Sequence, residues 1–525
     1  MKKAIVLAAA VFSCCAWNSV AAAEEYADSP ASEMGQASAE AAQAPEGEAL
    51  PLSLAESIGM ALDTDESIEA AQARREAAKW NLAAARRAKG PTVSWNSQAY
   101  KIGGRNYKSA NDAHDAYGAP HSDPYGTRPL YVLDNPPPGS PSWTLGSPLT
   151  VGSYAYHNTF ANSWNLSVPI YTGGQLEGQI ATGRYNLNGA DLSLENERQQ
   201  TRYRAAEAYA NLLHRENMVA IAREAVDMAD VELRLIGDQY SEGMVAKADV
   251  ILMEVRRSNY QQNLVNAKGA AQVARNTLAS VLGLPIDTEV QPTDVFTYEP
   301  YGRDLPACEE FALQNRPDGL AAQYAVKAAE AQVDVAKSGY RPKVTGVAGQ
   351  SIASNSPFRS ERSNSWEAGI NLSWNIFDNG VTRANVGSAA STLDQYRAEE
   401  RRVRKAITLE TRSAYINMKT AEQNILDTAA AVKLAEESYS IAQVRYEEGV
   451  DILLTVADAQ EKLTQARSNY YTALYQYNLS RAALEKAMGV PVGFDAAAYK
   501  ESEQQGASAD KALAQAQVRL QEEEK

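Results

Sequence analysis

Few ionisable residues in this chain are of the types that carry out catalysis. There are four histidines, and His114 and His121 stand near three aspartates between residues 112 and 123. A metal site is conceivable there, but the stretch lacks the tight ligand spacing of zinc sites. We find no serine-hydrolase, zinc-protease or phosphate-loop motif. The sequence therefore predicts a protein that is not an enzyme and that uses no metal or cofactor.

A pair of glycines follows acidic residues at matching positions. The stretch "YSEGMVAKADVILME" begins at Tyr240, and "YEEGVDILLTVADAQ" begins 206 residues later, at Tyr446. Each interrupts a long helical pattern, and glycine just beyond a helix end adopts the left-handed conformation at low cost. Gly243 and Gly449 therefore predict two tight turns between antiparallel helices. Asp451, followed by three apolar residues, has the position of a helix N-cap.

The sequence repeats itself beyond these turns. Shifted by 206 residues, it aligns with itself without a gap from Trp164 to Pro285. Upstream the offset becomes 251, because Pro91 falls on Pro342. The extra residues of the first copy lie between Lys101 and Tyr156 and have the composition of a loop, which we expect to face the outside of the cell. We infer two copies of one structural unit.

Each copy predicts a helix, two strands, a long helix, a turn and a final helix. Apolar and polar residues alternate from Trp366 to Ile376 and from Trp164 to Ile170, whereas the first strands, near 92–101 and 343–353, alternate less well. Strands with one apolar face are typical of outer-membrane barrels, and also of soluble sheets. Tryptophans on the apolar face favour the barrel, because tryptophan is common at membrane interfaces.

The helical patterns are unusually long. The proline-free stretch 176–241 predicts a helix of roughly 100 Å. It would pack against two shorter helices laid end to end, because an amphipathic helix of this length needs neighbours. The expected helices are 54–89, 176–241 and 248–282 in the first copy, and 309–339, 381–447 and 452–488 in the second.

The N-terminus has the pattern of a cleaved export signal. A lysine pair precedes an apolar stretch that ends at Phe12, and small residues follow up to Ala23, after which we expect cleavage. The alternative is a lipoprotein signal in which Cys14 is lipidated. Cleavage leaves Cys308 alone, so we expect no intrachain disulfide. The formal charge of −15 argues against a nucleic-acid partner.

These patterns divide the chain into six segments. We expect a signal peptide at 1–23, a flexible acidic segment at 24–50, a first repeat at 51–285, a linker at 286–306, a second repeat at 307–492 and a flexible tail at 493–525.

The order of these features resembles the TolC-type outer-membrane efflux protein family. The resemblance is carried by the doubled unit, "YTGGQLEG" and "FDNGVTRA" after the second strands, "YxEG" at the turns, and "GLP" and "GVP" at the unit ends. It covers residues 52–492, roughly. It implies an α+β membrane protein in which three chains form a 12-stranded outer-membrane β-barrel, four strands per chain, continuous with a long α-helical tunnel in the periplasm. The number of strands agrees, since four are too few to close a barrel and eight leave no lumen.

The resemblance also implies a function and partners. The chain would form a homotrimer in outer-membrane lipid and serve as the exit duct of a tripartite efflux or type I secretion system. Its partners would be a periplasmic adaptor and an inner-membrane pump of the RND, ABC or MFS type. Cargo and pump stay open. The alternative is a coiled-coil protein of the cell envelope without a pore.

Family members close the tunnel at the helix turns, which makes the nearby residues the candidate pore gate. The resemblance places Asp458 in a ring of aspartates in the lumen, and Thr455 stands where a second such aspartate is common. Tyr446 and Asp249 match members of a tie between closed tips, but Asp451 stands where some members carry arginine. Asp458 is alternatively part of a solvated helix face, and Asp451 a simple cap.

Overall fold

The computed structural model describes residues 50–101, 158–354, 363–504 and 508–523. The chain forms two compact units, each of which contains segments from both halves of the sequence. We call them the hairpin unit, with residues up to Ile68, Glu197–Phe311 and Glu410–Val492, and the sheet unit, with Glu69–Asn196, Ala312–Leu409 and the residues from Gly493. The expected signal peptide, the acidic N-terminal segment up to residue 49 and the long loop lie outside the described residues.

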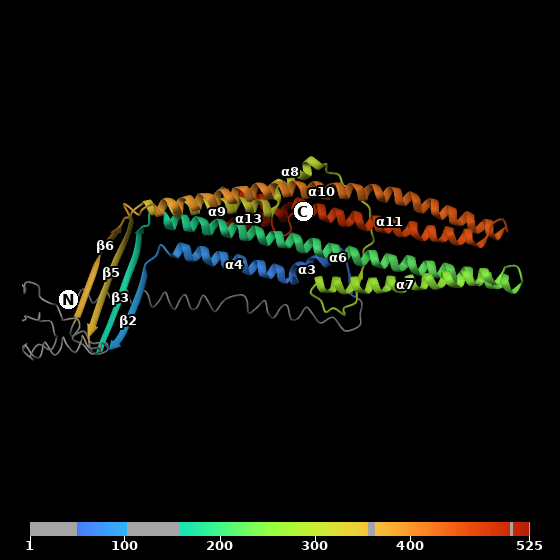
Figure 1. The fold of residues 1–525 in the computed structure, drawn as a ribbon, viewed down its shortest axis with the longest axis horizontal. Helices are drawn as coiled ribbons and strands as arrows, with labels where there is room; N and C mark the ends of the chain where they lie inside the picture. The colour runs from blue at the N-terminus through green and yellow to red at the C-terminus, as the bar shows by residue number, and fades with distance from the viewer. Residues whose placement is uncertain (1–49, 102–157, 355–362, 505–507, 524–525) are drawn as a thin grey trace, which may run out of the picture. The chain divides into compact units, whose positions relative to one another are not determined.

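The sheet unit contains a four-stranded antiparallel sheet in the order β2-β3-β5-β6 (Figure 1). The strands are β2 (Thr92–Lys101), β3 (Asn158–Tyr171), β5 (Lys343–Ser354) and β6 (Ser363–Ser373). All four were predicted by alternation, including the two with the weaker pattern. In β3 the register shifts between Pro169 and Tyr171, where a proline is tolerated because the ladder is interrupted.

One face of this sheet is apolar and exposed. Trp95 lies opposite Trp164, and Trp164 lies opposite Gln350, which in turn faces Trp366. Residues directly opposite one another in an antiparallel ladder share a face, so three tryptophans form a row across the sheet. Trp95 is 64% exposed and Trp366 79% exposed, and Ile370 and Leu372 further along β6 are exposed as well.

One long helix follows the second strand of each pair, and the two helices have equal length. α6 (Gln175–Ser241) and α10 (Val381–Glu447) each have 67 residues, as the proline-free patterns predicted. The returning helices are α7 (Lys247–Val281) and α11 (Leu453–Met488). In the hairpin unit α7 is tied to α6 by the ion pair of Arg275 with Glu216, and α11 is tied to α10 by the Thr411 hydroxyl, which donates to the Ala487 carbonyl.

The first predicted helix of each copy is broken. The expected helix 54–89 is α3 (Leu54–Thr64) and α4 (Glu66–Arg87), separated by Asp65 in an extended conformation. The Asp65 carboxylate accepts hydrogen bonds from the Ser67 amide at 2.8 Å and from Thr201 at 2.8 Å, which stabilises the break. The expected helix 309–339 is α8 (Leu305–Asn315), α9 (Pro317–Lys337) and a 3-10 turn, η3 (Ser338–Tyr340). Here Pro317 biases Arg316 away from the helical region, and Arg316 has ψ 123°.

One further expectation, the flexible C-terminal tail, is corrected. The linker 286–306 contains the strand β4 (Val290–Pro292), which pairs in parallel with β1 (Leu50–Leu52). The residues after 492 are not a flexible tail where the structure describes them, because they form α12 (Ala496–Gln504) and α13 (Ala509–Glu523). Phe494 and Tyr499 are fully buried in the sheet unit, in one apolar cluster with Leu192 and Tyr324. The Ala- and Gln-rich composition concealed these few buried anchors.

None of the described helices is long and apolar enough to cross a lipid bilayer.

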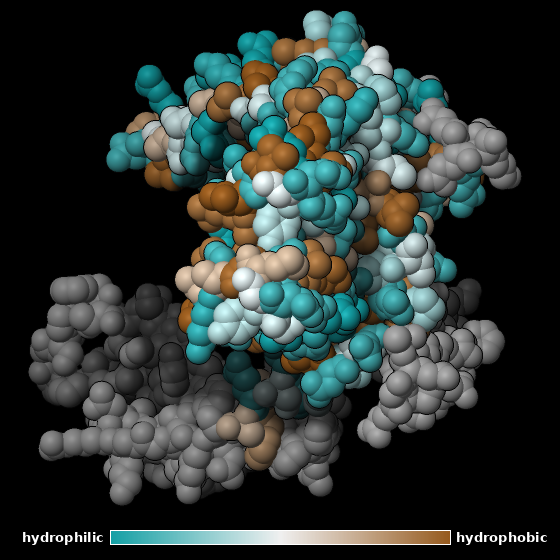
Figure 2. All heavy atoms as spheres, turned by 90° about the vertical axis from the view of Figure 1, so that its right-hand side faces the viewer, coloured by the Kyte–Doolittle hydropathy of each residue, from teal (hydrophilic) through white to brown (hydrophobic). Residues whose placement is uncertain are grey.

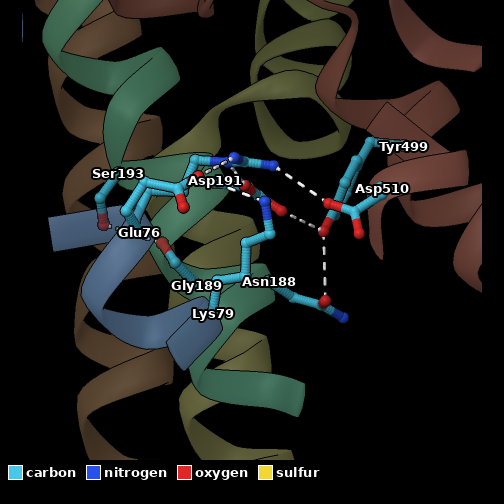
Figure 3. A network of polar contacts seen from close by, with 9 residues as sticks. Glu76, Lys79, Asn188, Gly189, Asp191, Ser193, Tyr499 and Asp510 are labelled. Atoms are coloured by element: carbon cyan, nitrogen blue, oxygen red, sulfur yellow. Dashed lines mark hydrogen bonds and ion pairs between the residues drawn. The ribbon is translucent and has the colours of Figure 1, made fainter. Parts of the chain in front are cut away.

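A buried polar network attaches the C-terminal helices α12 and α13 to the rest of the sheet unit (Figure 3). The Asp191 side chain on α6 has no exposed surface, and it accepts from Arg75 on α4 at 2.5 Å and from the Tyr499 hydroxyl at 2.8 Å. Asp510 on α13 lies 3.5 Å from the same guanidinium. Burial raises the pKa of the Asp191 carboxyl, while Arg75 and Tyr499 oppose that rise by stabilising its charge.

A second buried ionisable group lies in the hairpin unit. His214 on α6 is 7% exposed and stacks on Tyr475 of α11, with ring centroids 4.8 Å apart. Within the described residues its Nδ1 atom has no hydrogen-bond partner. Burial, assisted by the positive charge of Arg215, lowers the pKa of His214 to about 4, so the imidazole is neutral in the folded protein near pH 7.

We predict that Arg75→Met destabilises the protein by about 3–5 kcal/mol, because it leaves the Asp191 charge buried without its cation. The double variant Arg75→Met/Asp191→Leu should recover part of this loss, since it removes the unpaired charge as well. Thermal unfolding of the detergent-extracted protein measures both. A double variant no more stable than Arg75→Met would show that the pair is not coupled in this way.

We also predict that His214 makes stability depend on pH. Its folded pKa lies below the unfolded value of about 6.5, so its contribution is complete above pH 6.5 and is lost as the pH falls toward 4. The loss should be on the order of 3 kcal/mol at the acid end. His214→Phe keeps a stacking ring without a titrating group and should unfold with less difference between pH 7 and pH 4.5 than the wild type. Equal differences in the two proteins would refute this role.

Candidate functional site

Both helix turns of the hairpin unit are closed in the same way. At the first, Gly243 has φ 76°, its amide donates to the Tyr240 carbonyl, and the Met244 amide donates to the Gln239 carbonyl. At the second, Gly449 has φ 72°, and the amides of residues 449 and 450 donate to the carbonyls of residues 446 and 445. This double bond pattern is the Schellman motif. The positive φ accounts for glycine at both turns, since an added Cβ would meet nothing within 4 Å.

Polar and apolar side chains mix on the surface that carries the turns. Seen from the side on which both turns lie in Figure 1, apolar residues are interspersed among polar ones (Figure 2). Met244 is 70% exposed, and Val450 and Ile452 beside the second turn are exposed to a similar degree.

The carboxylates of Asp249 and Asp451 each accept hydrogen bonds from residues of their own turn. Asp249 accepts from the Ala246 amide at 3.3 Å, at the start of α7. Asp451 accepts from the Thr455 hydroxyl at 2.8 Å, the Ile452 amide at 2.9 Å and Arg445 at 3.3 Å. The bond from the Thr455 hydroxyl is the largest of the causes that lower the pKa of the Asp451 carboxyl. The N-cap prediction for Asp451 is wrong by one residue, because α11 begins at Leu453 with Ile452 at the cap.

Tyr446 joins the two helical hairpins. Its hydroxyl donates to the Gln239 side chain on α6 at 2.8 Å, and its ring packs against the apolar cluster of Ile236, Met253, Leu453 and Ala457. Burial raises the pKa of the Tyr446 phenol, and the Asp249 charge adds to that rise. The Asp249 charge therefore acts on Tyr446, while the hydrogen bond of Tyr446 goes to Gln239.

Asp458 lies on α11 and is 53% exposed. Its Oδ1 atom accepts from the Arg256 guanidinium of α7 at 3.0 Å. The candidate gate residue is thus paired with a cation from the other hairpin. Whether it faces a lumen depends on the assembly and stays a prediction.

Further contacts between the hairpins were missed by sequence reasoning. Tyr439 on α10 donates to Glu232 on α6 at 3.3 Å, and Arg467 on α11 bridges Glu224 of α6 at 2.6 Å and Glu436 of α10 at 2.9 Å. Burial raises the pKa of the Glu232 carboxyl. A signal was available for part of this set. Glu232 and Tyr439 stand seven residues before Gln239 and Tyr446, so both donor–acceptor pairs recur at the heptad spacing of packed helices.

In the part of the chain that the structure describes, no three histidine, cysteine or acidic side chains are grouped as metal ligands would be. The alternative metal site at His114 and His121 lies outside those residues.

Comparison with known proteins gives a family match over more than half of the chain. The model of the family "Outer membrane efflux protein" matches residues 139–284 and 310–490. Among curated proteins, the chain is 25% identical to the pyoverdine export outer membrane protein OpmQ of Pseudomonas aeruginosa over 54% of this chain and 60% of that protein. It is 28% identical to the solvent efflux pump outer membrane protein SrpC of Pseudomonas putida, over 45% of this chain and 50% of that one. The chain therefore spans about half the length of these relatives.

Solved structures share the fold at low identity. The outer-membrane channel OprN superposes with a TM-score of 0.65 at 18% identity, over 83% of this chain and 89% of that chain. VceC of Vibrio cholerae gives the same score and identity over 83% and 96%. The family match covers both helical hairpins and their turns, and the chain accordingly belongs to the outer membrane efflux protein family and is a protein of the outer membrane.

Proposed function

We propose that three copies of this chain form a channel through the outer membrane, with a helical tunnel in the periplasm. The channel passively conducts cargo that an inner-membrane pump delivers through a periplasmic adaptor. The observation that carries the proposal is the sheet, which exposes an apolar face with a row of tryptophans. Such a face suits lipid, and tryptophan suits its interface with water.

The edges of the sheet support a trimer. Within the described residues β2 and β6 each pair on one side only, so each leaves a row of backbone groups unpaired. Unpaired backbone groups are very costly in lipid, which makes closure with neighbouring chains the favourable solution. Three four-stranded sheets give a 12-stranded barrel, which has room for a lumen.

The helices point to the same assembly. Ile416, Leu434 and Val444 on α10 are each more than half exposed in the single chain. A second and a third copy would cover such side chains if the helices pack side by side as a tunnel wall. The matching lengths of α6 and α10 support a wall built from two equivalent hairpins per chain.

The relatives do not indicate one class of cargo. The relatives are named for pyoverdine export, solvent efflux and cobalt-zinc-cadmium resistance. Those differences favour a duct whose selectivity for cargo resides in the pump, of the RND, ABC or MFS type. The rival function, a coiled-coil envelope protein without a pore, accounts for the helices but leaves the exposed tryptophan row unexplained.

At the gate, we propose that the Asp458 carboxylates of three chains surround the lumen. Rings of carboxylates confer selectivity for cations and bind multivalent cations. Asp249 and Asp451 are engaged within their own turns, whereas the Asp458 side chain is 53% exposed although it pairs with Arg256 of the other hairpin.

Planar-bilayer recording tests the proposal. The purified protein should form cation-selective pores that multivalent cations block from the periplasmic side. Asp458→Asn should weaken a block by trivalent hexaamminecobalt about tenfold, because it removes three charges without removing volume. Asp427→Asn, at an exposed carboxylate of α10, is the matched control and should leave block and selectivity unchanged. A wild type without pores would overturn the function, and an unchanged block in Asp458→Asn would move the gate to other turn residues.

A further inference from the structure

Arg256, which pairs with Asp458, is more deeply buried than Asp458 itself. Arg256 is 17% exposed, and its two terminal nitrogens reach Asp458 at 3.0 Å and Glu461 at 4.0 Å, both on α11. Its neighbour Arg257 pairs at 2.5 Å with Asp230 on α6, inside its own hairpin. The two adjacent arginines of α7 thus have different partners: Arg257 pairs within its own hairpin, and Arg256 pairs with the other hairpin.

Residues from α6, α7 and α11 lie close to this arginine. Tyr260 one turn further on α7 and Glu232 on α6 are near enough for the Arg256 charge to favour their ionised forms, against the burial that disfavours them. Tyr439 of α10 donates to Glu232, and α11 supplies Asp458 and Glu461. Arg256 therefore lies among acidic or phenolic groups of α6, α7 and α11, and its ion pair with Asp458 is the contact that fixes the guanidinium against the other hairpin.

We propose that Arg256 determines the ion specificity of the gate by masking Asp458. The guanidinium and a mobile cation compete for the same carboxylate, so the channel attracts and is blocked by multivalent cations only as far as Arg256 is withdrawn. This inference depends on the proposed function, because it requires that Asp458 face the ion pathway.

Physical chemistry makes such a mask reversible. A pair with one half-exposed partner is held weakly, because water and salt screen it. The pair also joins α7 to α11, so a movement that separates the two hairpins must break it. Separation would then expose the carboxylate and raise the preference for cations at the moment the tip widens.

Four variants test the mask in planar bilayers, with hexaamminecobalt(III) as the probe. Arg256→Gln should tighten the block about tenfold or more and raise the cation preference, because the carboxylate loses its internal competitor. Arg256→Lys keeps the charge and should stay close to the wild type. Arg257→Gln removes the same charge one residue away, from a pair within one hairpin, and should change nothing. Arg256→Gln/Asp458→Asn should match Asp458→Asn alone.

The outcomes separate this inference from the function on which it depends. A wild type without pores ends both. Pores whose block depends on Asp458 but not on Arg256 leave the function standing and overturn the mask. The mask is also overturned if Arg256→Lys behaves like Arg256→Gln, or if Arg256→Gln tightens the block equally without Asp458. Arg256→Met, which keeps the apolar stem of this mostly buried side chain, is recorded in parallel and decides the matter if Arg256→Gln does not assemble.

Discussion

The backbone hydrogen bonds at the two edges of the sheet are the constraint on which the proposed assembly depends. A four-stranded sheet with one exposed apolar face is stable in lipid only if its edge groups find partners, because the hydrocarbon offers none. The row from Trp95 through Trp164 to Trp366 crosses all four strands, and each chain would contribute one third of the closed barrel. The 67-residue helices α6 and α10, which follow β3 and β6, need neighbouring chains as well, because they expose apolar side chains.

The turns show how a short motif can carry both structure and charge. Glycine at 243 and 449 closes each hairpin by satisfying the last carbonyls of a helix, and the acidic residues that follow are placed by that closure. The Asp451 carboxylate accepts hydrogen bonds from Thr455 and Arg445 within its own turn. Asp458 lies further along α11 and accepts a hydrogen bond from Arg256 of the other hairpin. The difference in partners, rather than in charge, separates a structural aspartate from a candidate gate residue.

Periodicity predicted the elements well where one pattern ran without interruption. The bounds of α6 and α10 agree with the patterns, because a proline-free amphipathic stretch has few other ways to bury its apolar face. The breaks at Asp65 and before Pro317 were missed, although Pro317 was a visible signal that the preceding residue would leave the helix. The C-terminal helices were missed because their anchors, Phe494 and Tyr499, are few among alanines and glutamines. The partner of Asp458 lay beyond sequence reasoning, since Arg256 and Arg257 are indistinguishable until the packing of α7 decides which faces α11.

The central claim is that three chains together make one channel, and the mass of the detergent-extracted particle tests it most directly. Light scattering with the detergent contribution subtracted should give the mass of three chains, and the same particle should sediment as an elongated body. A particle with the mass of one chain, and with no larger species at higher protein concentration, would contradict the account, because a lone four-stranded sheet cannot enclose a pore.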